Sequence, residues 1–186
     1  MEYLINFDYH ITAFIHSIIP HNIFFDYFFS FLSLRGNSIL FWIVLIVIAI
    51  LLEERKHPGI QKKDIQFITT FLLSFLFTSL LVNVVLKNIF QRPRPLPTTT
   101  YNLITTTCPS DYSFPSGHAS SAFAAATVLA AFDKKRRWVY FTFAFLISFS
   151  RIYLGCHYFF DVLAGALIGW SISFVILKLK GYWVRQ

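Results

Sequence analysis

The sequence predicts an all-α protein, a polytopic membrane helical bundle of about six helices. The chain of 186 residues is 56% hydrophobic and contains 23 Phe, but only 13% of its residues are charged. A soluble domain has about 25% charged residues. Five segments are almost free of charge, namely 38–52, 65–86, 117–132, 138–150 and 158–177. We therefore expect five firm membrane spans and, before them, an N-terminal interfacial or broken helix.

The order of these segments predicts one integral-membrane domain over residues 1–186. Residues 1–35 mix aromatic and apolar residues with acidic and His residues, and Pro20 interrupts the run. We expect amphipathic, interfacial helices near 4–18 and 22–33. The core helices are expected within 36–180. A loop over 91–115, rich in Pro and Thr, separates two of them, because such a segment cannot cross a bilayer unless protein surrounds it.

The positive charges predict the orientation of the bundle. The net charge is +7, which in a soluble protein is typical of nucleic-acid binding. Here most cations lie in two alternate connections and the tail, so the positive-inside rule explains them and no nucleic-acid partner is expected. These cations are Arg55, Lys56, Lys62, Lys63, Lys134, Lys135, Arg136, Arg137, Lys178, Lys180 and Arg185. The 91–115 loop then lies on the outer side.

Four cations violate this pattern, because they lie in or beside the expected outer loops: Lys87, Arg92, Arg94 and Arg151. The residues that gather at the expected outer ends of the helices are Lys87, Arg94, Ser116, Gly117, His118, Ser150, Arg151, His157 and Asp161. A Lys, Arg or Asp at the centre of a membrane helix costs about 2.5–3.5 kcal/mol. Snorkelling explains single cations near a helix end, but it does not explain why three separate segments together form an anion-binding set of residues.

The residue types favour phosphate chemistry. Lys87, Arg94 and Arg151 supply three cations, and an Arg can hold phosphate oxygens with two hydrogen bonds. The run "PSGH" over 115–118 opens a helix, whose free backbone N–H groups add an anion site. His157 and Asp161 are four residues apart, hence on one helix face. The carboxylate is expected to accept Nδ1–H of His157 and to leave the lone pair of Nε2 directed outward, as in a nucleophilic or basic His, with His118 available as the general acid.

These residues form three ordered blocks that resemble the signature of the type 2 phosphatidic acid phosphatase superfamily. The blocks are Lys87-x6-Arg94-Pro95, Pro115-Ser116-Gly117-His118 and Ser150-Arg151-x5-His157-x3-Asp161. The flanking hydrophobic pattern resembles the family's integral-membrane branch. The resemblance implies a helical fold, no metal or other cofactor, and a phosphohistidine intermediate on the nucleophile His157. It also implies leaving-group protonation by His118 and phosphate contacts from Lys87, Arg94, Ser116, Gly117 and Arg151, with Asp161 orienting His157.

The predicted function is a membrane lipid phosphate phosphatase in a bacterial cytoplasmic membrane, with its active site and the 91–115 loop facing outward. Its expected partners are the bilayer and a lipid phosphate: undecaprenyl diphosphate, phosphatidylglycerol phosphate, lipid A 1-phosphate or phosphatidic acid. Neither the head group nor the oligomeric state follows from the sequence. One alternative is a transporter or channel with an intramembrane Arg, His and Asp relay. Another is an enzyme similar to the vanadate-dependent haloperoxidases, which are soluble.

Cys108 and Cys156 allow two outcomes. Both are expected on the outer side, one in the long loop and one beside His157. In an oxidising compartment a disulfide would tie the loop over the site. Otherwise the two residues remain thiols.

Overall fold

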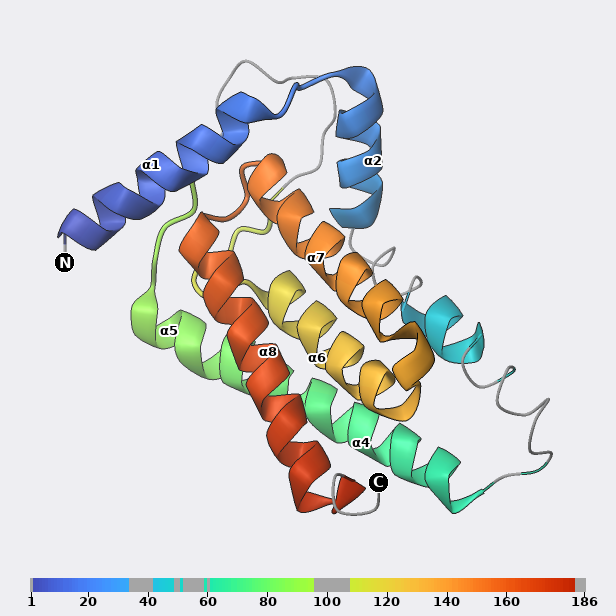
Figure 1. Ribbon diagram of the computed structural model, residues 1–186. Helices are drawn as coiled ribbons and strands as arrows, with labels where there is room; N and C mark the ends of the chain where they lie inside the picture. The colour runs from blue at the N-terminus through green and yellow to red at the C-terminus, as the bar shows by residue number, and fades with distance from the viewer. Residues whose placement is uncertain are drawn as a thin grey trace.

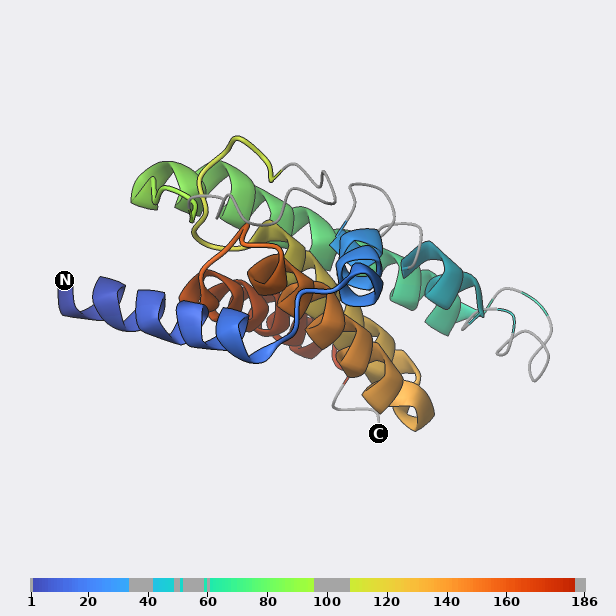
Figure 2. The same cartoon turned by 90° about the horizontal axis from the view of Figure 1, so that it is seen from above.

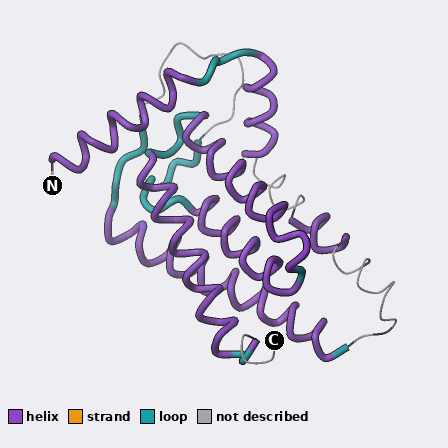
Figure 3. Tube along the Cα trace, in the orientation of Figure 1, coloured by secondary structure: helices purple, strands orange, loops and turns teal. Residues whose placement is uncertain are grey.

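The computed structural model describes residues 2–33, 42–48, 51, 59, 61–95 and 108–182. Within these ranges the chain forms helices and loops and no strands (Figure 3). Besides a helical stretch over 42–48, the elements are α1 (Glu2–Ile18), α2 (Ile23–Ser33), α4 (Lys62–Ser79), the π-helix η1 (Leu80–Leu86), α5 (Lys87–Phe90), α6 (Gly117–Phe132), the 3₁₀-helix η2 (Lys134–Arg136), α7 (Arg137–Tyr153) and α8 (Phe159–Leu179).

The expected helices are largely confirmed. The helices expected near 4–18 and 22–33 correspond to α1 and α2, and the long apolar run after residue 61 forms the continuous helix α4–η1–α5. The last three expected spans correspond to α6, α7 and α8. The expected span over 38–52 is described only at 42–48 and 51, which are helical, and the rest of it lies outside the described residues.

Within the described parts of the chain, two helices are long and apolar enough to cross a membrane, Lys62–Phe90 and Phe159–Leu179. α6 and α7 are shorter, at 16 and 17 residues. α4 and α8 expose large apolar side chains, among them Leu72, Leu76, Leu167 and Leu179. Exposed apolar surface of this extent is typical of a membrane-embedded protein.

α6 lies at the centre of the bundle. It packs against α8, α7 and α4, while α2 packs against α7, and α1 contacts both α7 and α8. Figures 1 and 2 show α6, α7 and α8 side by side, with α4 crossing them and α1 lying across the end where α8 begins. α6 is rich in Ala, and its residues Ala122, Ala125 and Ala126 belong to the main buried apolar cluster. Small residues allow membrane helices to approach closely.

Two glycines of α8 let it approach the backbone of α6. A Cβ atom on Gly165 would lie 2.4 Å from the carbonyl oxygen of Ser116, and one on Gly169 would lie 2.0 Å from the carbonyl oxygen of Ser120. Because the atoms they would meet belong to the backbone, no rotamer change can relieve the clash. The N–H of Ser116 donates to the carbonyl of Asp161 at 2.9 Å. The first turns of α6 and α8 are therefore held together at one end of the bundle.

This close approach makes a prediction for stability. Gly169→Ala places a methyl group against the backbone of Ser120, so α6 and α8 have to separate, at a cost of about 1–3 kcal/mol. Thermal unfolding of the detergent-purified variant should therefore begin at a lower temperature. Ser171→Thr is the control, since it adds one methyl group to an exposed position of the same helix. Equal unfolding temperatures for the two variants would contradict this account of the contact.

Candidate active site

The first predicted block lies where the long helix ends. The π-helix η1 directly precedes α5, which begins at Lys87, and π-helical turns are frequent at functional sites. Gln91 ends the helix in the left-handed conformation, with φ at 45°. The chain then turns back toward the bundle and carries Arg94 with it. Lys87 is only 5% exposed, and its ammonium group donates to the carboxylate of Asp111.

Arg94 connects this segment to the loop between α7 and α8. Its Nη1 donates to the carbonyl of Cys156 at 2.7 Å and lies 3.0 Å from Nε2 of His157. Its Nη2 pairs with Asp111 at 2.5 Å. The two cations of the first block therefore hold one carboxylate between them.

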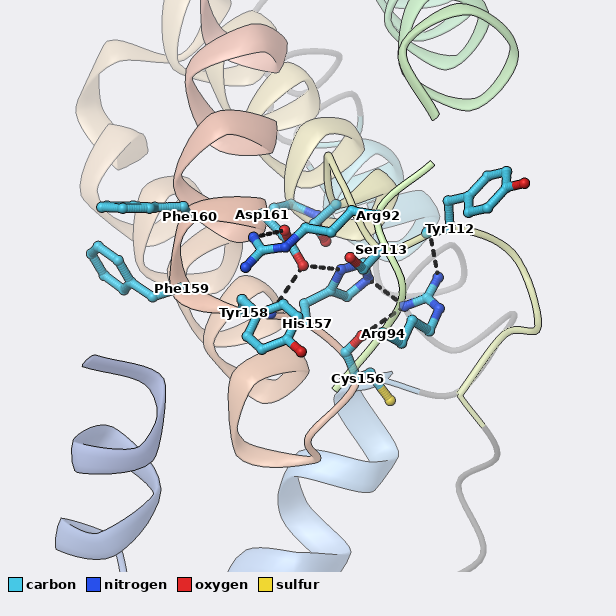
Figure 4. A network of polar contacts seen from close by, with 12 residues as sticks. Arg92, Arg94, Tyr112, Ser113, Cys156, His157, Tyr158, Phe159, Phe160 and Asp161 are labelled. Atoms are coloured by element: carbon cyan, nitrogen blue, oxygen red, sulfur yellow. Dashed lines mark hydrogen bonds and ion pairs between the residues drawn. The ribbon is translucent and has the colours of Figure 1, made fainter. Parts of the chain in front are cut away.

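His157 lies between Arg94 and Asp161, as Figure 4 shows. A guanidinium group can only donate hydrogen bonds, so Nε2 of His157 has to accept from Arg94 and carries no proton. Burial lowers the pKa of His157, and the positive charges of Arg151, Arg94 and Lys87 lower it further. The imidazole is therefore neutral at pH 7, with the lone pair of Nε2 directed toward the cations.

Asp161 contacts the other ring nitrogen of His157. Its Oδ2 lies 3.5 Å from Nδ1, which is longer than a good hydrogen bond. In place of the hydrogen bond expected from the sequence, the structure therefore has a longer polar contact between Asp161 and the neutral imidazole. The carboxylate accepts two shorter hydrogen bonds, from the N–H of Tyr158 at 2.9 Å and from Arg92 at 2.7 Å. Asp161 has no exposed surface.

The second block begins α6. Ser116 is the N-cap of this helix, and its hydroxyl accepts from the N–H of Ala119 at 3.4 Å. A Cβ on Gly117 would lie 2.8 Å from the amide oxygen of Asn83 in η1, so glycine permits the approach of these two segments. His118 follows in the first turn of α6 and faces the same cavity as Lys87, Arg94 and His157.

Arg151 and Ser150 lie behind the site. Arg151 is buried near the end of α7 and donates to the side chain and to the carbonyl of Ser33 in α2. The hydroxyl of Ser150 donates to the carbonyl of Ile147 at 2.6 Å, within α7. Among the predicted residues, Lys87, Arg94, Gly117, His118 and His157 line the cavity. Ser116, Arg151 and Asp161 are buried and are not among the residues that line it.

The cavity has a volume of about 660 Å³. Its polar end is formed by the five residues named above together with Asp111. Its other end is apolar and is lined by Phe71, Leu72 and Phe75 of α4 and by Trp42, Ile43 and Ile46. The arrangement suits an amphipathic molecule with an anionic group at one end.

The loop before α6 is fixed to the site. Cys108 and Cys156 form a disulfide, with 5.4 Å between their Cα atoms, which decides between the two outcomes that the sequence left open. Asp111 follows three residues later. Burial raises the pKa of its carboxyl group, but the hydrogen bonds from Lys87 and Arg94 outweigh this effect, so the pKa is lowered overall. Asp111 is therefore ionised at neutral pH.

Three residues that the sequence did not single out belong to this network: Arg92, Asp8 and Asp111. Arg92 was visible as one more cation beside the outer loop. Asp8 had only a weak signal, as an acidic residue within an apolar N-terminal segment. Asp111 lies in the polar run before "PSGH" and has no fixed spacing to a partner. Among the described residues, no group of three His, Cys, Asp or Glu could hold a metal ion.

Known proteins share this sequence pattern and fold. Residues 67–185 match the model of the PAP2 superfamily. An undecaprenyl-diphosphatase of Sulfolobus acidocaldarius is 30% identical over 81% of this chain and 68% of its own length. A lipid A 4'-phosphatase of Bacteroides thetaiotaomicron is 29% identical over 96% of this chain and 81% of its own.

Solved structures agree with this similarity. The crystal structure of LpxE from Aquifex aeolicus has a TM-score of 0.65 and 30% identity, covering 91% of this chain and 93% of its own. The phosphatidylglycerolphosphate phosphatase of Bacillus subtilis has a TM-score of 0.69 over 97% of this chain and 87% of its own, with 23% identity, and therefore supports the fold alone. With the family model matching more than half of its length, the chain belongs to the PAP2 superfamily, as an all-helical, membrane-associated member.

Proposed function

We propose that this protein is a phosphatase of membrane lipid phosphates that works through a phosphohistidine on His157. One observation carries the proposal: three separate segments bring two cations and two histidines to the polar end of a cavity whose other end is apolar. A lipid phosphate has the same distribution of charge. Its phosphate group would lie against Lys87 and Arg94, and its apolar part would lie toward α4.

The residues support a sequence of proton and phosphoryl transfers. Nε2 of His157 attacks phosphorus, and the bond from phosphorus to the lipid oxygen breaks. His118 donates a proton to that oxygen, since the negative charge of a bound phosphate favours the protonated imidazole. A water molecule, deprotonated by His118, then attacks the phosphohistidine, which releases phosphate and restores His157. Lys87 and Arg94 stabilise the charge on the phosphoryl oxygens throughout.

We propose that the protein lies in a bacterial cytoplasmic membrane and that its active site faces the outer side. The basic segments Lys62–Lys63, Lys134–Arg137 and Lys178–Lys180 belong to the end of the bundle opposite the first turns of α6 and α8 (Figure 1). By the positive-inside rule, this arrangement supports an outward-facing candidate site. Intact cells should hydrolyse nitrophenyl phosphate, which does not cross the membrane, as fast as permeabilised cells do. Hydrolysis only after permeabilisation would reverse the orientation.

The function is tested by phosphate release from purified lipid phosphates in detergent. The panel contains undecaprenyl diphosphate, phosphatidylglycerol phosphate, lipid A 1-phosphate and phosphatidic acid. We expect release from at least one of them, and activity should survive excess EDTA, because Lys87 and Arg94 already supply the positive charge that a metal ion would provide. Solute flux through proteoliposomes without phosphate release would favour a transporter instead.

The two histidines should respond differently to the leaving group. General-acid help to a lipid alkoxide is worth about 10²–10⁴-fold, whereas nitrophenolate leaves without it. His118→Ala should therefore lose most of its activity on lipid but retain a single-turnover burst of nitrophenolate. His157→Ala should give no burst with either substrate, because the nucleophile is gone. Equal losses for His118→Ala on both substrates, or a burst from His157→Ala, would reassign the roles.

Asp111 should compete with the substrate phosphate. Its carboxylate pairs with both Lys87 and Arg94, yet its side chain is 48% exposed, so an incoming phosphate can displace it. An exposed ion pair is worth about 0.2–1 kcal/mol, so Asp111→Asn should bind vanadate up to about fivefold more tightly. Inhibition by vanadate measures this, with Ser110→Ala on the same loop as the control. Weaker inhibition of Asp111→Asn would mean that Asp111 instead orients the two cations for phosphate.

A further inference from the structure

The N-terminal helix reaches the candidate active site through one buried carboxylate. Nη1 of Arg92 donates to Oδ2 of Asp8 and to Oδ1 of Asp161, each at 2.7 Å. Asp8 is only 1% exposed. The guanidinium group lies 4.0 Å from the ring centroid of Tyr158, so the ring limits its movement. Arg92 thus joins a residue of α1 to the carboxylate that contacts His157.

The second oxygen of Asp8 has a separate partner. Oδ1 accepts the N–H of Phe160 at 2.9 Å. One turn further along α1, the hydroxyl of Thr12 accepts the N–H of Phe159 at 3.0 Å. These N–H groups begin α8 and have no acceptor within the helix. α1 therefore caps the helix that carries Asp161, and within α1 only Asp8 makes both this cap and the contact with Arg92.

The charges explain why a second carboxylate is useful. Arg92 and Asp161 alone would form a neutral pair. His157 would then face Arg94, Lys87 and Arg151, whose charge Asp111 offsets only in part, with no net negative charge on its Nδ1 side. Adding Asp8 gives the group of two carboxylates and one guanidinium a net charge of −1 behind the imidazole. When Nε2 of His157 attacks phosphorus, the ring gains positive charge. A net negative charge on the Nδ1 side stabilises that state.

We propose that Arg92 and Asp8 are positioning residues for the reaction at His157. Arg92 fixes Asp161 against the imidazole, and Asp8 fixes Arg92 and offsets the positive charge of its guanidinium group. This inference rests on the proposed phosphohistidine chemistry. Its chief consequence is that the two residues act as one unit: a change at Asp8 should matter only while Arg92 is present.

A double-mutant cycle on vanadate affinity tests this coupling, because vanadate bound at Nε2 mimics five-coordinate phosphorus and needs no lipid. We expect Arg92→Gln to weaken vanadate binding by about 10–100-fold and Asp8→Asn by about tenfold, the range for groups that orient an active-site ligand. The double variant should bind vanadate as Arg92→Gln does, since Asp8 acts through Arg92. Multiplied losses in the double variant would overturn the proposal.

Two further variants separate positioning from simple support of the fold. Thr12→Val removes a cap of α8 but no contact with Arg92, so it should lower the unfolding temperature and leave vanadate affinity unchanged. Arg92→Lys keeps the charge and should recover part of the loss seen in Arg92→Gln, with kcat rather than KM responding on nitrophenyl phosphate. Vanadate affinity that falls as much in Thr12→Val as in Asp8→Asn would refute the positioning role.

Failure of the proposed function would look different. Wild-type protein that binds vanadate but hydrolyses no phosphate ester would refute the proposed function, while the double-mutant cycle would still report the coupling between Asp8 and Arg92.

Discussion

The arrangement of the site depends on Asp161, whose carboxylate has no exposed surface. Burying the charge of Asp161 is costly unless opposite charge and hydrogen bonds balance it. Arg92 supplies the charge, the N–H of Tyr158 supplies a hydrogen bond, and the backbone carbonyl of Asp161 accepts from Ser116. Each partner comes from a different part of the chain. Satisfying one buried residue therefore brings the start of α6, the segment after α5 and the start of α8 into contact around His157.

Glycines at the helix contacts make it sterically possible for these three segments to come together. Gly165 and Gly169 allow α8 to lie directly against the backbone of α6, and Gly117 allows α6 to approach Asn83 in η1. A membrane helix gains little from burying apolar side chains, because lipid is equally apolar. Close backbone contacts and buried hydrogen bonds stabilise the bundle instead, and both occur at the end of the bundle where α6 and α8 begin. Of the residues at these contacts, Gly117 and Asn83 also line the cavity.

The sequence predicts the helices and most of the candidate site because their signals are local. Hydrophobic runs give the helix positions, and one helical turn places His157 and Asp161 on the same face. The sequence could not show that Arg92 meets Asp8 across 84 residues and Asp161 across 69, since no spacing rule connects such partners. It could not give side-chain direction either. Ser116 and Arg151 were expected to touch phosphate, and that role stays a prediction; in the structure both are buried and contact Ala119 and Ser33, respectively.

The disulfide has a mechanical consequence. Cys156 immediately precedes His157, so the loop that carries Asp111 is covalently attached next to the nucleophile. The loop cannot swing away as a lid. Ser113 also ties the loop to the segment after α5, through hydrogen bonds to the carbonyls of Arg92 and Pro93. Asp111 therefore leaves the two cations most easily by turning its own side chain. Because the covalent tie exists only while the two sulfur atoms are oxidised, the redox state of the surrounding compartment sets how far this loop can move from His157.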